Sequence, residues 1–155
     1  MVKIHKAMLN APGMEQSEVN IFLSTSKTPL RLGTVDSKGE PMIHPVWFDY
    51  LNDRLYILSL KDNLKVRNIR GKKRVYFSID TDAEPHKGVK GKGTAMILAD
   101  IGKAVPISKK MVSKYLDPNT AMAKRIIDGI QKGTEVLVEI TPLYFSTWDY
   151  SKMRN

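Results

Sequence analysis

Short runs rich in β-branched and aromatic residues, separated by turns of a few residues, constrain the fold of this chain more than any other feature. The first three runs span residues 30–35, 40–50 and 55–59, and Asp, Asn and Gly mark the turns between them. Turns this short force neighbouring strands to pair antiparallel. Further strands are predicted at residues 74–79, 88–100 and 135–148. Six strands with local connections predict a closed or nearly closed antiparallel barrel.

Apolar residues at helical spacing predict helices at the margins of this barrel. Val19, Phe22 and Leu23 give residues 15–24 one apolar face. A short helix follows the third strand, with Asp62 as its expected N-cap. The predicted helices are residues 15–24, 63–70, 108–115 and 120–131. The fold class is therefore mainly β (α+β), with helices flanking the antiparallel strands.

Length and composition limit the kinds of protein and site that this chain can form. Its 155 residues, 42% of them apolar, predict one domain over residues 1–155, with residues 1–13 as an irregular N-terminal arm. The absence of cysteine excludes disulfides, thiolate metal sites and cysteine nucleophiles. The three histidines are scattered, so no metal site is predicted. No signal peptide or long apolar run is visible, which predicts a cytoplasmic protein without a membrane segment.

The formal charge of +9 predicts a surface that attracts anions. Nucleic acid, acidic lipid and a phosphorylated small molecule are all compatible with it, and so is a solvated lysine-rich surface without a partner. The chain shows no helix-turn-helix spacing, zinc finger or aromatic RNA-binding signature. Nucleic-acid binding is therefore disfavoured, because charge alone predicts only non-specific, salt-sensitive contact.

The segment from Ser59 to Lys65 is the first candidate binding site, because a strand ends there and a helix begins. A helix start offers unpaired backbone N–H groups and the positive end of a dipole, which suits a phosphate. Ser59 and Asn63 can donate neutral hydrogen bonds, Lys65 supplies a point charge, and Arg67 adds a planar guanidinium. On these grounds alone, an ordinary capped helix with a solvated basic face remains the better interpretation.

The strand at residues 41–50 is the second candidate. Pro45 withholds a hydrogen-bond donor from the sheet, which indicates a sheet edge or an irregularity, and freed backbone groups there can face a planar heterocycle. Strand alternation places His44 and Trp47 on opposite faces. A single histidine without an acid or nucleophile partner is more simply a core histidine, so no catalytic side chain is predicted.

Residues 87–94 alternate lysine with glycine and superficially resemble a phosphate-binding loop. They lack the spacing and the Gly-Lys-Ser/Thr ending of such loops, and they fall where a strand is expected. Gly91 and Gly93 inside a strand indicate a bulge or the close approach of another group, and we interpret the segment as a bulged strand with alternating lysines. Lys90 and Lys92 then share one face, where they can approach an anion or simply protect a sheet edge.

Three segments in order resemble the pyridoxamine 5′-phosphate oxidase-like split-barrel family, most closely its small flavin- or deazaflavin-binding members. They are residues 30–41, residues 44–48 with the sequence His-Pro-Val-Trp-Phe, and residues 65–69 with the sequence Lys-Val-Arg-Asn-Ile. The resemblance covers residues 17 to 100 together with the last strand. It implies a six-stranded antiparallel split barrel with flanking helices. Leu64 stands where the true oxidases carry an arginine, so oxidation of vitamin B6 is not assigned.

The resemblance also implies a homodimer with two cofactor sites in its interface grooves. The strand matching residues 44–47 would run along the flavin ring, mostly through its backbone, and the segment at residues 59–65 would hold the phosphate. The implied cofactor-binding residues are His44, Pro45, Val46, Trp47, Ser59, Leu60, Asn63, Leu64, Lys65 and Lys90.

The function that follows from the resemblance is that of an FMN-dependent oxidoreductase, because in such proteins the flavin carries the redox chemistry. Its substrate would be a small molecule or a nicotinamide. The alternatives are a deazaflavin-dependent reductase, a non-catalytic flavin-binding protein and, from the charge, a basic nucleic-acid-binding barrel.

Overall fold

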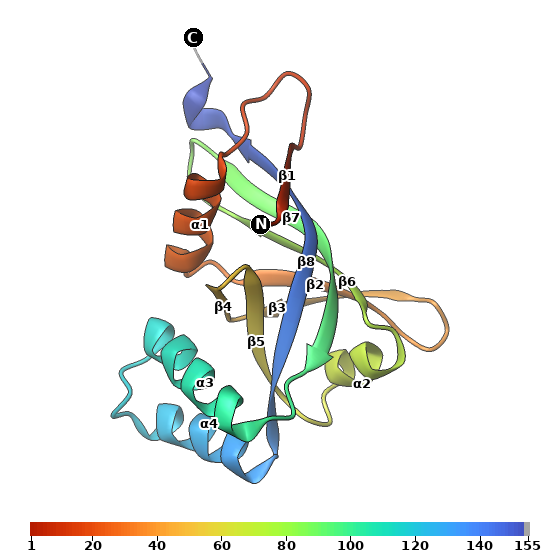
Figure 1. Cartoon of the computed structure of the whole chain (residues 1–155), viewed down its shortest axis with the longest axis vertical. Helices are drawn as coiled ribbons and strands as arrows, with labels where there is room; N and C mark the ends of the chain where they lie inside the picture. Colours follow the sequence, from red (N-terminus) through yellow and green to blue (C-terminus); the bar gives the residue numbers. More distant parts are fainter. Residues whose placement is uncertain (154–155) are drawn as a thin grey trace.

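A computed structural model describes residues 1–153, in which eight strands form one sheet (Figure 1). The strands are β1 (Lys3–Lys6), β2 (Leu30–Val35), β3 (Pro41–Val46), β4 (Phe48–Leu51), β5 (Arg54–Leu60), β6 (Arg74–Asp80), β7 (Lys87–Ile97) and β8 (Glu135–Asp149). Neighbours in the order β3-β2-β6-β7-β8-β5-β4 are antiparallel, and β1 pairs parallel with β8.

The sheet curls because its two end strands are consecutive in the chain. β3 and β4 lie at opposite ends of the strand order, yet only Trp47 separates them. The sheet therefore bends round until its ends meet at Trp47, and the result is a split barrel with flanking helices. The predicted fold class is confirmed, with eight strands in place of six.

The helices are α1 (Gln16–Thr25), α2 (Leu64–Gly71), α3 (Ile101–Tyr115), α4 (Ala121–Lys132) and a 3₁₀ turn at Tyr150–Lys152. α1 packs against β4 through the predicted apolar face of Val19, Phe22 and Leu23. α3 and α4 pack side by side, with α4 also against β8, while α2 packs against β2 (Figure 1). None of the described helices is both long and apolar enough to span a membrane.

The core fills the inside of the curl. In β2, Leu30, Leu32 and Thr34 are buried while the residues between them face outward, as strand alternation requires. Phe48 and Phe145 are fully buried in the same cluster. A second cluster, which contains Tyr56, Ala104, Met111, Ile130 and Leu137, attaches α3 and α4 to the barrel. These helices therefore sit on the barrel through an apolar contact of their own.

Two predicted segments differ because distant residues determine them. The strand expected at residues 40–50 is broken at Trp47, which gives β3 and β4. The arm expected at residues 1–13 contains β1, whose residues pair with Tyr144 to Thr147. In both cases the decisive contacts lie far away in the sequence, beyond the reach of local patterns.

Helix boundaries supply further corrections. The N-cap of α2 is Asn63, one residue after the predicted Asp62. α3 begins at Ile101 rather than at residue 108, because the Asp100 side chain accepts a hydrogen bond from the Lys103 N–H and starts the helix. Pro106 lies inside α3, where it removes one helical hydrogen bond without ending the helix.

The bulge predicted in the glycine-rich strand is confirmed. The register of β7 against β8 shifts between Lys92 and Gly93. A Cβ atom on Gly91 would lie 2.3 Å from the Tyr144 carbonyl oxygen, and one on Gly93 would lie 2.7 Å from that of Thr141. Both positions therefore require glycine, because the backbone of β8 approaches too closely for any side chain.

Candidate functional site

β3 is an edge strand, as Pro45 predicted, because in the described part of the chain it pairs only with β2. Its side chains alternate as expected: Val46 is buried and His44 half-buried, while Ile43 is 76% exposed on the outer face. Trp47 follows at the break and is 37% exposed. β3 thus presents an open backbone edge beside one histidine and one indole.

Tyr115, at the end of α3, holds the break after β3. Its ring stacks on Trp47 with centroids 4.7 Å apart and planes 2° from parallel. Its hydroxyl accepts a hydrogen bond from the Phe48 N–H at 3.1 Å and donates one to the Phe48 carbonyl at 2.9 Å. Lys114 Nζ adds a bond to the same carbonyl at 3.2 Å. The backbone groups that leave the sheet at this point are therefore satisfied by α3.

The start of α2 leaves several donors free. Asn63 caps the helix without a side-chain capping bond, and the N–H groups of Leu64 and Lys65 have no hydrogen-bond partner within residues 1–153. Ser59, at the end of β5, is buried and donates to the Leu60 carbonyl at 3.2 Å. Unpaired donors at a helix start form a ready place for an anion.

Lys65 adds a charge to these donors. It forms no ion pair with any described residue, and partial burial lowers its pKa. Burial also lowers the pKa of His44, and the nearby positive charge of Lys65 lowers it further. The two candidate segments both lie against β2, because β3 pairs with β2 and α2 packs against the same strand.

Three side chains connect β3, β2 and α2 inside the barrel. His44 Nε2 and Thr34 Oγ1 are hydrogen-bonded at 2.9 Å, and Asn68 Nδ2 donates to the same Thr34 oxygen at 2.9 Å. Asn68 Nδ2 also lies 3.5 Å from Met42 Sδ. Thr34 and Asn68 fall inside the segments that carry the family resemblance, but sequence patterns assigned no role to either of them, because their partners lie on other elements.

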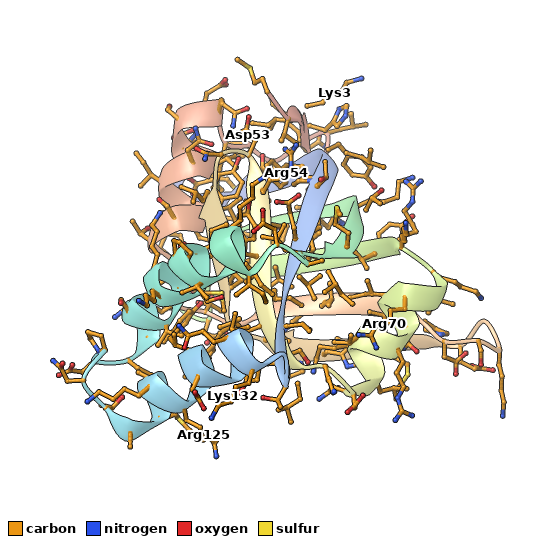
Figure 2. The ribbon with its side chains drawn as sticks, turned by 60° about the horizontal axis from the view of Figure 1, so that its bottom comes forward. Lys3, Asp53, Arg54, Arg70, Arg125 and Lys132 are labelled. Carbon is orange, nitrogen blue, oxygen red and sulfur yellow. The ribbon has the colours of Figure 1, made fainter. Side chains whose placement is uncertain are left out.

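The surroundings of α2 are strongly basic. Residues 61–74 contain seven lysines and arginines and one acidic residue, Asp62. None of these seven forms an ion pair with another described residue. Arg70, labelled on α2 in Figure 2, is exposed, and Arg67 and Lys72 line a groove of about 520 Å³ between α2 and the turn after β2. The local field at the helix start therefore favours an anion.

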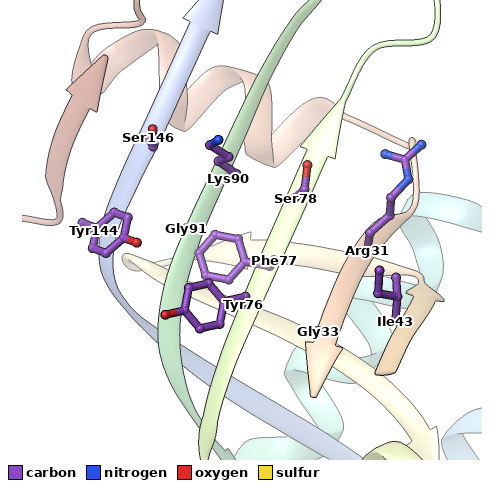
Figure 3. A pocket seen from close by; sticks show the side chains of 10 residues that line it. All are labelled: Arg31, Gly33, Ile43, Tyr76, Phe77, Ser78, Lys90, Gly91, Tyr144 and Ser146. Atoms are coloured by element: carbon purple, nitrogen blue, oxygen red, sulfur yellow. The ribbon is translucent and has the colours of Figure 1, made fainter. Parts of the chain in front are cut away.

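Lys90 lies elsewhere, on the outer face of β7. Arg31, Ser78, Lys90 and Ser146 stand opposite one another across β2, β6, β7 and β8 and form a polar row (Figure 3). The row lines a cavity of about 550 Å³, together with Ile43, Tyr76 and Tyr144. None of the residues at 59–65 lines this cavity, so the single chain does not bring Lys90 and the start of α2 into one cavity. The sequence signal for this row is the alternation of side chains along a strand, which places every second residue on the same face of the sheet.

Comparison with known proteins identifies relatives by sequence pattern and by fold. The family model described as pyridoxamine 5′-phosphate oxidase matches residues 16–149. No curated protein matches the sequence significantly.

Solved structures share the fold at low sequence identity. A conserved hypothetical protein from Mycobacterium tuberculosis is 21% identical with a TM-score of 0.80, and the match covers 97% of this chain and 94% of that one. An FAD-binding protein from Mesorhizobium loti is 21% identical with a TM-score of 0.62, over 90% and 97% of the two chains. An F420 reductase is 22% identical with a TM-score of 0.63, over 80% and 93%.

Proposed function

This chain belongs to the pyridoxamine 5′-phosphate oxidase family, and we propose that it binds FMN across β3 and the start of α2 and uses it as an oxidoreductase. The observation that carries the proposal is Lys65, a partly buried lysine without a carboxylate partner among residues 1–153, beside the free N–H groups of Leu64 and Lys65. A phosphate fits this donor set, because it supplies the negative charge and acceptor atoms that the donors lack.

The remaining candidate residues divide into two groups by their chemistry. Ser59 and Asn63 would add neutral hydrogen bonds to the phosphate. Leu60 and Leu64, which are 58% and 44% exposed, offer apolar contacts beside it. The open edge formed by His44, Pro45, Val46 and Trp47 would lie along the ring. When bound, the flavin would supply hydride transfer, while the protein binds and orients it.

We further propose that the protein is a homodimer whose second copy completes each site. The outer sheet face carries exposed apolar side chains, including Ile43 and Tyr76, and the cavity that contains Lys90. Large exposed apolar surfaces mark interaction sites in soluble proteins. A partner packed on this face would allow Lys90 of one copy to approach the cofactor held by the other. Light scattering on a size-exclusion column tests the dimer.

A deazaflavin is the second candidate cofactor. The fold is shared with an F420 reductase as well as with an FAD-binding protein, and the donor set around Lys65 suits any flavin-like tail that carries a phosphate. A protein that binds flavin without turnover is the other alternative.

The visible absorption spectrum of the purified protein, followed by titration of the apoprotein with FMN and with a deazaflavin, tests cofactor binding. We expect FMN to bind and reduced nicotinamide to be oxidised faster than by free FMN. A protein that binds neither compound would contradict the proposal. Binding without turnover would leave the non-catalytic alternative.

A further inference from the structure

Two hydrogen bonds link Asn68, Thr34 and His44, and the donor in each can be identified. Thr34 has a single hydroxyl proton, which needs one acceptor. The Asn68 amide nitrogen can only donate, so Thr34 Oγ1 accepts from it. Thr34 is 1% exposed, and His44 Nε2 is the only other described group bonded to its hydroxyl. The Thr34 hydroxyl proton must therefore point at His44 Nε2, or it has no acceptor.

The opposite arrangement is costly. A proton on Nε2 would make Thr34 accept two hydrogen bonds while its own buried proton remained unsatisfied. Leaving a buried donor without a partner destabilises a protein, so the arrangement in which every proton has an acceptor is preferred. Thr34 thus donates to Nε2, and the proton of the neutral imidazole resides on Nδ1.

We propose that Thr34 and Asn68 fix His44 as the neutral Nδ1–H tautomer, and that this N–H is the donor that the site offers to an acceptor atom of its ligand. His44 Nδ1 forms no hydrogen bond within the described part of the chain, and the side chain is only half-buried. The matching ligand is a planar heterocycle with a carbonyl or ring-nitrogen acceptor. The tautomer follows from the protein alone, whereas the ligand contact rests on the proposed flavin function.

Thr34 and Asn68 are positioning residues in this arrangement. Asn68 lies on α2, one helical turn after Lys65, while His44 lies on β3. The helix that is proposed to hold the phosphate therefore also sets which nitrogen of the ring-side histidine carries a proton. The hydrogen-bond chain couples the two halves of the site through 2.9 Å bonds that a displacement of α2 would break.

Nitrogen NMR of the histidine rings tests the tautomer directly. Only His5, His44 and His86 contribute signals, and a His44→Asn spectrum assigns the relevant one. We expect the Nδ1–H pattern for His44 in the unmodified protein and in Thr34→Ser, which keeps the hydroxyl. Thr34→Val keeps the shape and removes the hydroxyl, so the tautomer should no longer be fixed. An Nε2–H pattern in the unmodified protein would overturn the proposal.

Asn68→Asp provides a sharper test, because it should reverse the direction of the hydrogen bonds that link Asn68, Thr34 and His44. A carboxylate at position 68 accepts the Thr34 proton, so Thr34 Oγ1 then accepts from His44 Nε2–H and the tautomer changes. An unchanged Nδ1–H pattern in a folded Asn68→Asp protein would show that Asn68 does not set the direction. Thr34→Val gives an independent answer if Asn68→Asp fails to fold.

The ligand contact is tested with FMN as the probe. His44→Asn places an amide N–H near the position of Nδ1–H, whereas His44→Phe removes the donor and keeps a ring. We expect FMN affinity to fall about tenfold in His44→Phe and much less in His44→Asn. Equal affinities in all three proteins would overturn the contact even if NMR shows the tautomer. If the unmodified protein binds no flavin, the proposed function fails and the tautomer is still judged by NMR.

Discussion

Two partly buried lysines in this molecule have opposite surroundings. Lys114, on α3, donates to the carbonyls of Leu23 and Phe48 and lies 3.8 Å from the Asp49 carboxylate. Lys65, on α2, has no such partner in the described chain. Burial lowers the pKa of both, but the Asp49 charge partly offsets this effect for Lys114 only. Both lysines are partly buried, so the difference between them is the partner: Lys114 has one and is structural, whereas Lys65 has none among the described residues and is the lysine proposed to bind a ligand.

The same contrast extends to the backbone around each lysine. At the break between β3 and β4, Tyr115 and Lys114 satisfy the freed groups of Phe48. At the start of α2, the N–H groups of Leu64 and Lys65 remain unpaired within residues 1–153. At the β3 end of the candidate site, the backbone is held by hydrogen bonds from α3. At the α2 end, backbone N–H groups have no partner among the described residues. A site needs both features, because unused donors bind a ligand specifically only when they are held in place.

Removing Lys114 should have the largest effect. Lys114→Met leaves the Asp49 carboxylate, whose side chain is only 5% exposed, with Lys110 at 3.9 Å as its remaining cation, and the Lys110 side chain is 56% exposed to screening water. We expect the free energy of unfolding to fall by about 3 kcal/mol, as when one partner of a buried ion pair is removed. Urea denaturation measures it. Lys110→Met, at an exposed position, should cost far less, and adding Asp49→Asn to Lys114→Met should recover part of the loss. Equal losses in the two single variants would remove the contrast.

Removing Lys65 should affect binding instead of stability. Lys65→Ala is expected to weaken FMN binding by about 1.5–3 kcal/mol, because a charged contact to phosphate is lost. Riboflavin, which lacks the phosphate, serves as the matched ligand and should bind both proteins equally. Fluorescence titration gives the dissociation constants. An equal loss for both ligands would place the phosphate elsewhere, and a large loss of stability would make Lys65 a structural residue like Lys114.

Variants of Tyr115 distinguish its two contributions to the break after β3, which are the ring stack on Trp47 and the hydroxyl hydrogen bonds to Phe48. Tyr115→Phe keeps the stack on Trp47 and removes the hydroxyl bonded to both backbone groups of Phe48. We expect a loss of about 1–2 kcal/mol in unfolding free energy. The Trp47 environment should be unchanged, as read by tryptophan fluorescence in a Trp148→Phe background. Tyr115→Leu should change both quantities. A shifted Trp47 spectrum in Tyr115→Phe would mean that the hydroxyl, rather than the stack, positions the indole.

Local sequence signals predicted the elements whose causes are local. The strand at residues 30–35 agrees with β2 at both ends, Pro45 marks an edge strand, and the glycines mark a bulge. The basic run at residues 61–74 is visible directly in the sequence. Each of these depends on residue type and alternation within a few positions, which a single sequence contains.

The parts that sequence missed depend on long-range contacts. The break at Trp47 is held by Tyr115, which follows Phe48 by 67 positions. The buried hydrogen bond between Asn68 and Thr34 joins residues 34 positions apart, so no local sequence pattern indicates the role of either residue. Lys90 lies on a strand, as the sequence predicts. That strand places it on the outer sheet face, in a cavity that no residue from the start of α2 lines. Which groups meet in a site is a property of the packed fold.

The smallest predicted effect is a pH dependence that belongs to Lys65 alone. Its pKa in the free protein lies below the ordinary value of 10.5, because burial disfavours the charge. A bound phosphate favours the ammonium and raises that pKa, so FMN affinity should be full at neutral pH and fall as the pH rises through the free-protein pKa. The ratio of FMN to riboflavin dissociation constants isolates this effect, because titration of the shared ring cancels. Lys65→Arg should keep the ratio flat, since arginine stays charged. A ratio in the unmodified protein that stays constant up to pH 10.5 would show that Lys65 does not contact the phosphate.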